Sequence, residues 1–216
     1  MKVLIVNPSL DYSRMFLEEG WHLAQSLHEA DLVQFTGGAD VTPSLYGHDK
    51  HPTTMNNPER DRMEILIFKQ AVMQGKALAG ICRGGQFLNV MCGGTMWQDV
   101  DRHTASHLAK DLATGTLFLV SSTHHQMMQP GPEGQLLAVA FESTRRTECR
   151  AGGRTYTVLE KQDGGDPEVV LYPKMRALCF QPHPEFEGAR YREMREWYFD
   201  YLRLHLNVGK DIKCVA

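Results

Sequence analysis

The sequence predicts an α/β fold in which a mostly parallel central sheet carries helices on both faces, with a small antiparallel addition. Three observations support this prediction. Short apolar runs alternate with segments of helical periodicity through the first half of the chain. Strand-like runs then follow one another, and a helical pattern closes the chain. The length of 216 residues fits one large domain, and we expect residues 1–216 to form it.

The first quarter of the chain alternates strand and helix patterns before a long loop. Residues 2–6 form a nearly continuous apolar run, typical of a parallel strand buried on both faces. Apolar residues recur at roughly helical spacing over 12–30, which predicts an amphipathic helix. A second strand is expected over 31–36, where it meets paired glycines. The following stretch, to Pro58, is rich in Pro, Gly, Asn and His and predicts a long loop, a kind of segment that often carries function.

Two helices flank the next predicted strand. Asn57, followed by proline and glutamate, has the character of an N-cap and predicts a helix over 57–74. Residues 77–81 read as a buried strand, and a further helix is expected over 84–91. Cys82 lies at the turn between the strand and that helix.

The second half of the chain is rich in strand patterns. The closing segment, 188–206, has helical periodicity and predicts a final helix. No internal repeat or shift in composition indicates a second domain. Strands are expected near residues 115–120, 136–141, 156–159, 169–172 and 177–180.

Charge and hydropathy argue against several classes of partner. The formal net charge is -3, and acidic and basic residues are interspersed, so nucleic acid is not an expected partner. No apolar run approaches the roughly 18 residues that span a bilayer, and no membrane association is expected. The first residues lack the features of a targeting peptide, which predicts a cytoplasmic location. The five cysteines are odd in number and have no CxxC spacing, so reduced thiols are expected.

The turn at Cys82 has the form Gly-Ile-Cys-Arg-Gly, the cysteine version of a nucleophile elbow. Glycines two residues on either side let the chain turn sharply, which lifts the sulfur above the sheet edge. The helix that begins there supplies positive potential and free N–H groups, which favour a thiolate and can bind an oxyanion. The same pattern also fits a buried structural cysteine in a glycine-rich turn.

A second pattern, Gln-Pro-His-Pro-Glu, follows another predicted strand and places His183 two residues before Glu185. In extended backbone, side chains at i and i+2 point to the same side. The histidine can then take the proton of a thiol while the carboxylate holds its other ring nitrogen. Taken alone, a His–Glu pair is also common on protein surfaces.

Together, these two motifs resemble the class I glutamine amidotransferases, in which cysteine, histidine and glutamate motifs occur in this chain order. The resemblance spans roughly residues 1–205 and implies a flavodoxin-like sheet. It is closest to the γ-glutamyl hydrolase branch, exemplified by γ-glutamyl-γ-aminobutyrate hydrolase. The further segments that carry it are Thr36–Gly38, Tyr46-Gly47, Pro58–Asp61, Gly93-Gly94, Gln98-Asp99 and Ser122–Gln126.

The resemblance implies a Cys-His-Glu catalytic triad. Cys82 is the expected nucleophile, His183 the general base and acid, and Glu185 the carboxylate that orients the histidine. The implied reaction is attack on a γ-glutamyl carbonyl, loss of ammonia or an amine, and hydrolysis of the thioester.

The same resemblance implies further contacts with the substrate. Backbone N–H groups near Gly38 and at Arg83 stand where the oxyanion hole is expected. Gln86 lies one helical turn beyond the nucleophile, so its side chain is expected to face the same mouth and bind the glutamyl group. His125 and Gln126, in the Ser122–Gln126 segment, are further candidates for substrate binding.

The remaining histidines and the absence of nucleotide motifs bear on cofactors. His103 and His107 have the i, i+4 spacing that would place two imidazoles on one helical face, as in some zinc sites. No acidic H-E-x-x-H motif accompanies them, so no metal is expected, and loop histidines or substrate contacts are the favoured interpretation. The role of His124 stays open. No glycine-rich nucleotide motif is present, and no cofactor is expected.

Three functions remain as alternatives. The leading hypothesis is a free-standing hydrolase that acts on a small γ-glutamyl substrate or glutamine. The second is a glutaminase subunit that supplies ammonia to a separate synthase or ligase. The third is a non-catalytic relative that only binds. The partners considered are therefore a second copy of the chain, in a homodimer, or a synthase.

Overall fold

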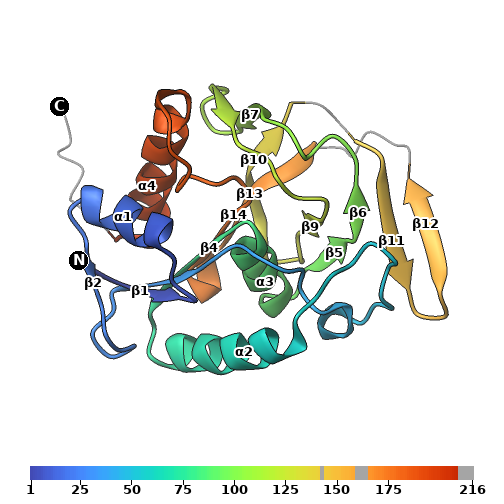
Figure 1. Ribbon diagram of the computed structural model, residues 1–216, viewed down its shortest axis with the longest axis horizontal. Coiled ribbons are helices and arrows are strands. Elements are labelled where there is room, and N and C mark those ends of the chain that lie inside the picture. The colour runs from blue at the N-terminus through green and yellow to red at the C-terminus, as the bar shows by residue number, and fades with distance from the viewer. Residues whose placement is uncertain (142–143, 159–164, 209–216) are drawn as a thin grey trace.

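The computed structural model describes residues 1–141, 144–158 and 165–208, and its main sheet has the strand order β2-β1-β3-β4-β14-β13-β10-β7-β8 (Figure 1). The first five pair in parallel: β2 (His22–Leu23), β1 (Lys2–Val6), β3 (Leu32–Phe35), β4 (Ala77–Ile81) and β14 (Ala177–Phe180). The other four are antiparallel to their neighbours: β13 (Asp166–Tyr172), β10 (Gln135–Ala140), β7 (His107–Asp111) and β8 (Leu117–Val120). The predicted α/β class is confirmed.

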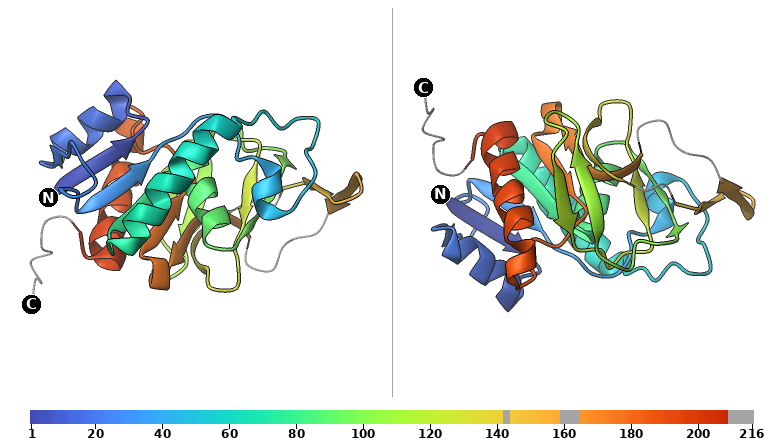
Figure 2. Two further views of the ribbon diagram at one scale, coloured as in Figure 1. Left: turned by 90° about the horizontal axis from the view of Figure 1, so that it is seen from below. Right: turned by 90° about the horizontal axis from the view of Figure 1, so that it is seen from above.

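Helices cover both faces of this sheet. Helices α1 (Leu10–Glu18) and α4 (Arg192–Leu206) contribute to one apolar core, and α2 (Pro58–Met73) and α3 (Arg83–Met91) contribute to the other. Figure 2 shows α2 in front of the sheet from below and α4 in front of it from above. Among the described residues, no helix has both the length and the apolar character needed to cross a membrane.

Two small antiparallel sheets stand beside the main one, on the side away from α1 (Figure 1). Strand β5 (Thr95–Trp97) pairs with β9 (Met127–Gln129). Strand β11 (Arg146–Arg150) pairs with both β6 (Asp99–Val100) and β12 (Arg154–Val158). Short 3₁₀ turns occur at Pro43–Tyr46, Pro173–Met175 and Ala189–Tyr191.

The first helix is shorter than the sequence pattern predicts. It ends at Glu18 instead of continuing to residue 30, because Gly20 has a positive φ of 78° and the chain turns there. Trp21 then donates its backbone N–H to Phe16 O and packs edge-on against the Phe16 ring, with 5.4 Å between centroids. Apolar residues beyond the helix are therefore buried by the turn, which imitates helical spacing.

Other elements agree with their predicted positions more closely. Helix α2 begins after Asn57, whose side chain accepts a hydrogen bond from Arg60 N at 3.1 Å, as an N-cap does. The closing helix begins at Arg192, after a 3₁₀ turn, instead of at 188. The expected strand over 156–159 corresponds to β12 as far as Val158, and residue 159 lies outside the described residues.

The interpretation of His103 and His107 as neighbours on a helix is wrong. His107 is the first residue of strand β7, and the segment before it is a bend. Strand β7 escapes prediction because its burial alternates, with Lys110 exposed between the buried Ala109 and Asp111.

The sheet brings three loops together. Strands β3, β4 and β14 are adjacent and parallel, so their carboxyl ends meet at one edge. These ends lead into Gly37, Cys82 and the segment that contains His183. The candidate nucleophile and its candidate base therefore meet through the strand order, although about 100 residues separate them in the chain.

Candidate active site

Cys82 lies in a sharp turn whose backbone excludes larger residues two positions away. Its φ of 51° and ψ of −116° lie outside the usual regions for a residue with a side chain. A Cβ atom at Gly80 would lie 2.2 Å from the carbonyl oxygen of Gly84, and one at Gly84 would lie 2.3 Å from that of Phe35. Helix α3 begins at Arg83, so the N–H groups of its first turn have no acceptor within the helix. The turn has the geometry of a nucleophile elbow.

His183 is held at both ring nitrogens and through its backbone. Its Nδ1 lies 2.6 Å from Glu185 Oε1, and its Nε2 lies 2.9 Å from Thr123 Oγ1. Its backbone N–H donates to Ser121 Oγ at 2.8 Å, and its ring stacks on Phe186 with 4.6 Å between centroids. The imidazole therefore has one defined orientation, with Nδ1 directed to the carboxylate.

Cys82 and His183 both flank Gly37. A Cβ atom at Gly37 would lie 3.4 Å from His183 Cε1 and 3.7 Å from Cys82 Cβ. Burial alone would lower the pKa of His183, but the neighbouring Cys82 and Glu185 raise that pKa to about 10. A protonated imidazole beside the sulfur is therefore favoured at neutral pH, and such a charge stabilises a thiolate.

Tyr12 is a neighbour of this group that the sequence did not single out. Its hydroxyl accepts a hydrogen bond from Gly37 N at 2.9 Å. Burial and the nearby Glu185 raise the pKa of Tyr12 far above its ordinary value, so the hydroxyl keeps its proton. The residue comes from α1, and no pattern in the sequence separates it from the other apolar residues of that helix.

An arginine holds the loop after β3 from the other side. Arg60 donates from Nη1 to Gly37 O at 2.9 Å and from Nη2 to Thr36 O at 2.8 Å. Its Nε donates to Glu64 Oε1, also at 2.8 Å. The segment Pro58–Asp61 was noted only as part of the resemblance, and the structure shows that it fixes the backbone beside the candidate nucleophile.

The side chain of Arg83 points away from the elbow into the protein. It is 1% exposed, it forms ion pairs with Asp61 and Glu64, and its Nε donates to Ala39 O at 3.2 Å. This network joins α3, α2 and the Gly37–Ala39 loop. It leaves the backbone N–H of Arg83 as the group that can face a substrate.

With this geometry established, comparison with known proteins identifies the family. The model of one family, peptidase C26, matches residues 15–150. This chain belongs to the peptidase C26 family. The matched residues include Cys82 but end before His183 and Glu185, whose positions follow from the sheet.

Relatives of this C26 chain share up to about two thirds of their length with it. A glutamine amidotransferase-like protein, YvdE, of Lactococcus lactis subsp. lactis is 33% identical over 157 residues, which are 72% of this chain and 66% of YvdE. Protein NtpR of Enterococcus hirae is 29% identical over 126 residues, which are 48% of this chain and 53% of NtpR. The chain thus covers less than two thirds of these relatives.

Solved structures share the fold of this C26 chain. A glutamine amidotransferase of Thermotoga maritima matches with a TM-score of 0.59 and 16% identity, covering 96% of this chain and 89% of that one. PurLQS of the same organism matches with a TM-score of 0.57 and 15% identity, covering 93% and 98%. At these identities, the likeness concerns the arrangement of the chain alone.

Two of the residues predicted to bind substrate are turned into the C26 fold. Gln86 is 2% exposed and donates its amide hydrogens to Gln126 O and Gln181 Oε1, both at 3.1 Å. Gln126 is 1% exposed and donates to Thr54 Oγ1 at 3.0 Å and to Gln98 O at 3.3 Å. Their donors join the elbow helix to its surroundings, and a contact with substrate stays a prediction.

The two neighbouring histidines differ in their surroundings. His125 is partly exposed, and the hydrogen bond between its Nε2 and Asp40 Oδ2, at 3.2 Å, raises its pKa. His124 is buried, and burial lowers its pKa well below the ordinary value. Its Nδ1 lies 2.7 Å from Gln126 O, which fixes the ring on the inner side of the loop.

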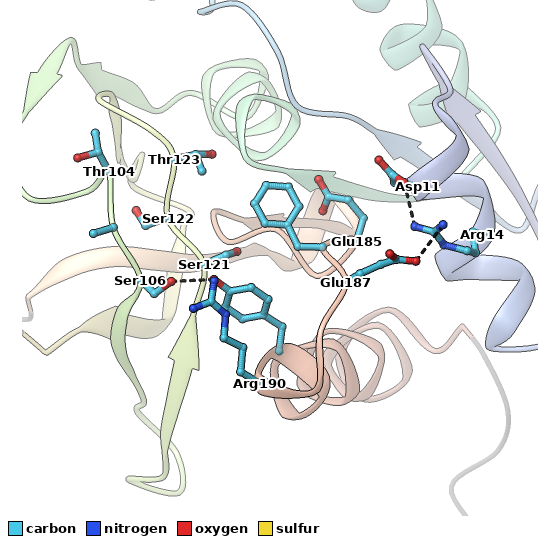
Figure 3. Close-up of a pocket in the computed structure, with 13 residues that line it drawn as sticks. Asp11, Arg14, Thr104, Ser106, Ser121, Ser122, Thr123, Glu185, Glu187 and Arg190 are labelled. Atoms are coloured by element: carbon cyan, nitrogen blue, oxygen red, sulfur yellow. Dashed lines mark hydrogen bonds and ion pairs between the residues drawn. The ribbon is translucent and has the colours of Figure 1, made fainter.

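A polar pocket opens beside the two side chains that hold His183. Its volume is about 530 Å³, and both Glu185 and Thr123 line it. Figure 3 shows Asp11, Arg14 and Glu187 joined on one side, with Arg14 2.9 Å from each carboxylate. On the other side, Ser106 and Tyr191 are hydrogen-bonded at 2.8 Å and Arg190 lies beside them (Figure 3). The pocket offers both charges to a polar ligand.

Proposed function

We propose that this protein is a cysteine-dependent amidase that hydrolyses a γ-glutamyl amide bond. The observation that carries the proposal is the meeting of Cys82, on its strained elbow, with a histidine oriented by Glu185. Membership of the peptidase C26 family supports amide hydrolysis as the reaction class. The γ-glutamyl substrate rests on the resemblance to the glutamine amidotransferases and on the named relatives.

The first half of the reaction forms a thioester. The sulfur of Cys82 attacks the γ-carbonyl carbon, and the carbonyl π electrons move to oxygen in a tetrahedral intermediate. When the intermediate collapses, the C–N bond breaks and His183 gives its proton to the leaving nitrogen, which departs as ammonia or an amine. Glu185 accepts a hydrogen bond from Nδ1 throughout and stabilises the imidazolium.

The second half releases glutamate. The neutral imidazole takes a proton from a water molecule, which attacks the thioester carbon, and the C–S bond breaks to return the thiolate. The oxyanion of both tetrahedral intermediates is assigned to the backbone N–H groups of Arg83 and Gly38. The arginine network described above holds both backbone segments, so these donors are positioned before substrate arrives.

Product release from a panel of substrates tests this function. Purified protein is incubated with glutamine and with γ-glutamyl conjugates of small amines, and free glutamate is measured. We expect turnover of at least one of them, and Cys82→Ser should reduce kcat by about 10³-fold or more. Cys92→Ser is the matched control and should keep full activity, because burial raises the pKa of that thiol to about 12 and makes it unreactive. Equal turnover by Cys82→Ser would refute the proposal.

The same panel separates a free-standing hydrolase from an ammonia-donating subunit. PurLQS, a solved structure with this fold, keeps a synthase partner under consideration. A subunit should prefer glutamine and should be stimulated by its partner, whereas a hydrolase should favour γ-glutamyl amines without one. We favour the hydrolase, because the pocket beside Glu185 and Thr123 has room for a leaving group larger than ammonia.

A further inference from the structure

A second group of polar side chains lies in the antiparallel half of the sheet, outside the proposed catalytic residues. His103 precedes β7, His107 begins it, and Glu168 lies on β13, with β10 between the two strands. One ligand atom from each of these side chains lies within 4.8 Å of the others. His103 and Glu168 are each 1% exposed, and the side chain of His107 is 19% exposed. The cluster is therefore built into the fold.

Both imidazoles are oriented by partners at their outer nitrogens. His103 Nε2 lies 3.2 Å from Asp166 Oδ2, and His107 Nδ1 lies 3.3 Å from the carbonyl oxygen of Ala105. Asp166 is itself fixed, because it accepts a hydrogen bond from Thr144 Oγ1 at 2.7 Å and pairs with Arg146. A histidine that binds a metal commonly donates its other N–H to a carboxylate or a carbonyl in this way.

The inner nitrogens converge on one carboxylate. His107 Nε2 lies 2.8 Å and His103 Nδ1 lies 3.6 Å from Glu168 Oε1. Among the described residues, neither His103 Nδ1 nor Glu168 Oε2 has a hydrogen-bond partner, although both atoms are buried. Buried polar atoms are ordinarily satisfied, so this pair indicates that a ligand is missing.

We propose that His103 Nδ1, His107 Nε2 and the carboxylate of Glu168 bind one Zn²⁺ ion. Two imidazoles and a carboxylate are a donor set that suits zinc, whereas calcium and magnesium prefer oxygen alone. Zinc bonds of about 2.0 Å in a tetrahedron place neighbouring ligand atoms about 3.3 Å apart. The observed 2.8 and 3.6 Å lie on either side of that value, so small movements complete the site.

The surroundings give the ion a path and a fourth ligand. A cavity of about 270 Å³ is lined by both histidines, and a water molecule within it would complete a tetrahedron. The carbonyl oxygen of His103 accepts hydrogen bonds from Ser122 Oγ and from His124 N. Because Thr123 contacts His183 from the same loop, an ion at this site would fix the loop that supports the proposed base. This inference goes beyond the proposed function and does not depend on it.

Metal binding is tested on the purified, tag-free chain. The metal is first removed with a chelator, and Zn²⁺ is then titrated by calorimetry, with bound metal counted by mass spectrometry. Co²⁺ is used as a spectroscopic probe, since tetrahedral Co²⁺ has strong visible absorption. The titration is repeated in Cys82→Ser, so that binding to the thiol cannot be mistaken for the new site. We expect one tight equivalent in both proteins.

Three variants locate the ion. Glu168→Gln and His107→Gln should each weaken Zn²⁺ binding by about 100-fold or more and abolish the Co²⁺ spectrum. His28→Gln, at an exposed histidine, should bind as the wild type does. Circular dichroism verifies that each variant is folded, and either site variant suffices if the other is not. Absence of a tight equivalent in the wild type, equal binding by a folded site variant, or tighter binding of Fe²⁺ than of Zn²⁺ would overturn the zinc assignment.

Discussion

The two halves of the main sheet build their polar sites in different ways. In the parallel half, strand ends and glycine contacts fix the backbone, and the strained turn at Cys82 then presents a single reactive atom. In the antiparallel half, side chains from β7 and β13 converge, and His103 and Glu168 have ordinary places in the chain but unusual neighbours. One loop serves both halves, because Thr123 contacts His183 and the ring of His124 lies 4.7 Å from that of His103.

This difference teaches that backbone geometry and side-chain convergence leave different traces in a sequence. An elbow needs glycines at fixed offsets and is therefore visible as a motif. A cluster assembled from separate strands depends on register, which no short motif records. The four predictions below test whether the two halves are as separate as their construction suggests.

The largest effect is expected at the proposed base. His183→Gln should lower kcat by about 10³- to 10⁴-fold, because the thiol loses its proton acceptor and the leaving nitrogen its donor. Steady-state kinetics with the best substrate of the panel measure this loss. His28→Gln is the matched control and should change kcat by less than about twofold. A His183→Gln enzyme with near wild-type kcat would place the chemistry elsewhere.

The next largest effect concerns stability in the parallel half. Arg83→Met should lower the free energy of unfolding by about 3–5 kcal/mol, because it leaves the buried carboxylates of Asp61 and Glu64 without their partner. Chemical denaturation measures the change. Arg62→Met, on the exposed side of the same helix, should cost less than about 0.5 kcal/mol. Similar losses in the two variants would mean that the buried network does not hold this half together.

A smaller effect on rate, with a pH signature, is expected at Glu185. Glu185→Gln should lower kcat by about 10²-fold, because the imidazolium loses the carboxylate that stabilises it. The pKa of His183 should fall from its wild-type value of about 10. A raised histidine pKa stabilises the folded state fully below about 6.5, and that contribution disappears as the pH rises through about 10.

Denaturation at several pH values checks this sign. The stability difference between the wild type and Glu185→Gln should be largest below about pH 6.5 and should shrink toward pH 10. Glu187→Gln, at an exposed neighbour, is the control and should show no such trend. A difference that grows with pH would contradict the assignment of a charged His183–Glu185 pair.

The smallest effect is expected where the two halves meet. Thr123→Val removes the hydroxyl 2.9 Å from His183 Nε2 while keeping the shape of the side chain. The loss of one hydrogen bond corresponds to about 1 kcal/mol, so kcat should change by about fivefold. Zinc binding should be unchanged, because Thr123 does not contact the cluster. A large loss of zinc affinity would show that the loop couples the halves more strongly than proposed.

Much of the parallel half can be predicted from the sequence. Its strands at 2–6 and 77–81 are continuous apolar runs, and their bounds match β1 and β4. The proposed triad follows from local motifs, because an elbow and an extended His–Glu pair need fixed spacings. Roles for its members stay predictions, as does the expectation of a single domain over residues 1–216.

The rest could not be predicted for physical reasons. Strands such as β6 and β9 have two and three residues and no period long enough to detect. Tyr12 and Thr123 reach the site through tertiary packing, which leaves no local pattern. His103 and His107 have helical spacing, yet strand pairing places them beside Glu168 instead.

Direct detection of the acyl enzyme tests the central claim. Wild-type protein is mixed with the substrate that it turns over fastest, quenched in acid during turnover, digested and analysed by mass spectrometry. We predict that the peptide containing Cys82 carries the mass of one γ-glutamyl group and that the adduct is lost on treatment with hydroxylamine. Steady turnover with no adduct on this peptide, or an equal adduct on Cys92 or Cys179, would contradict the account.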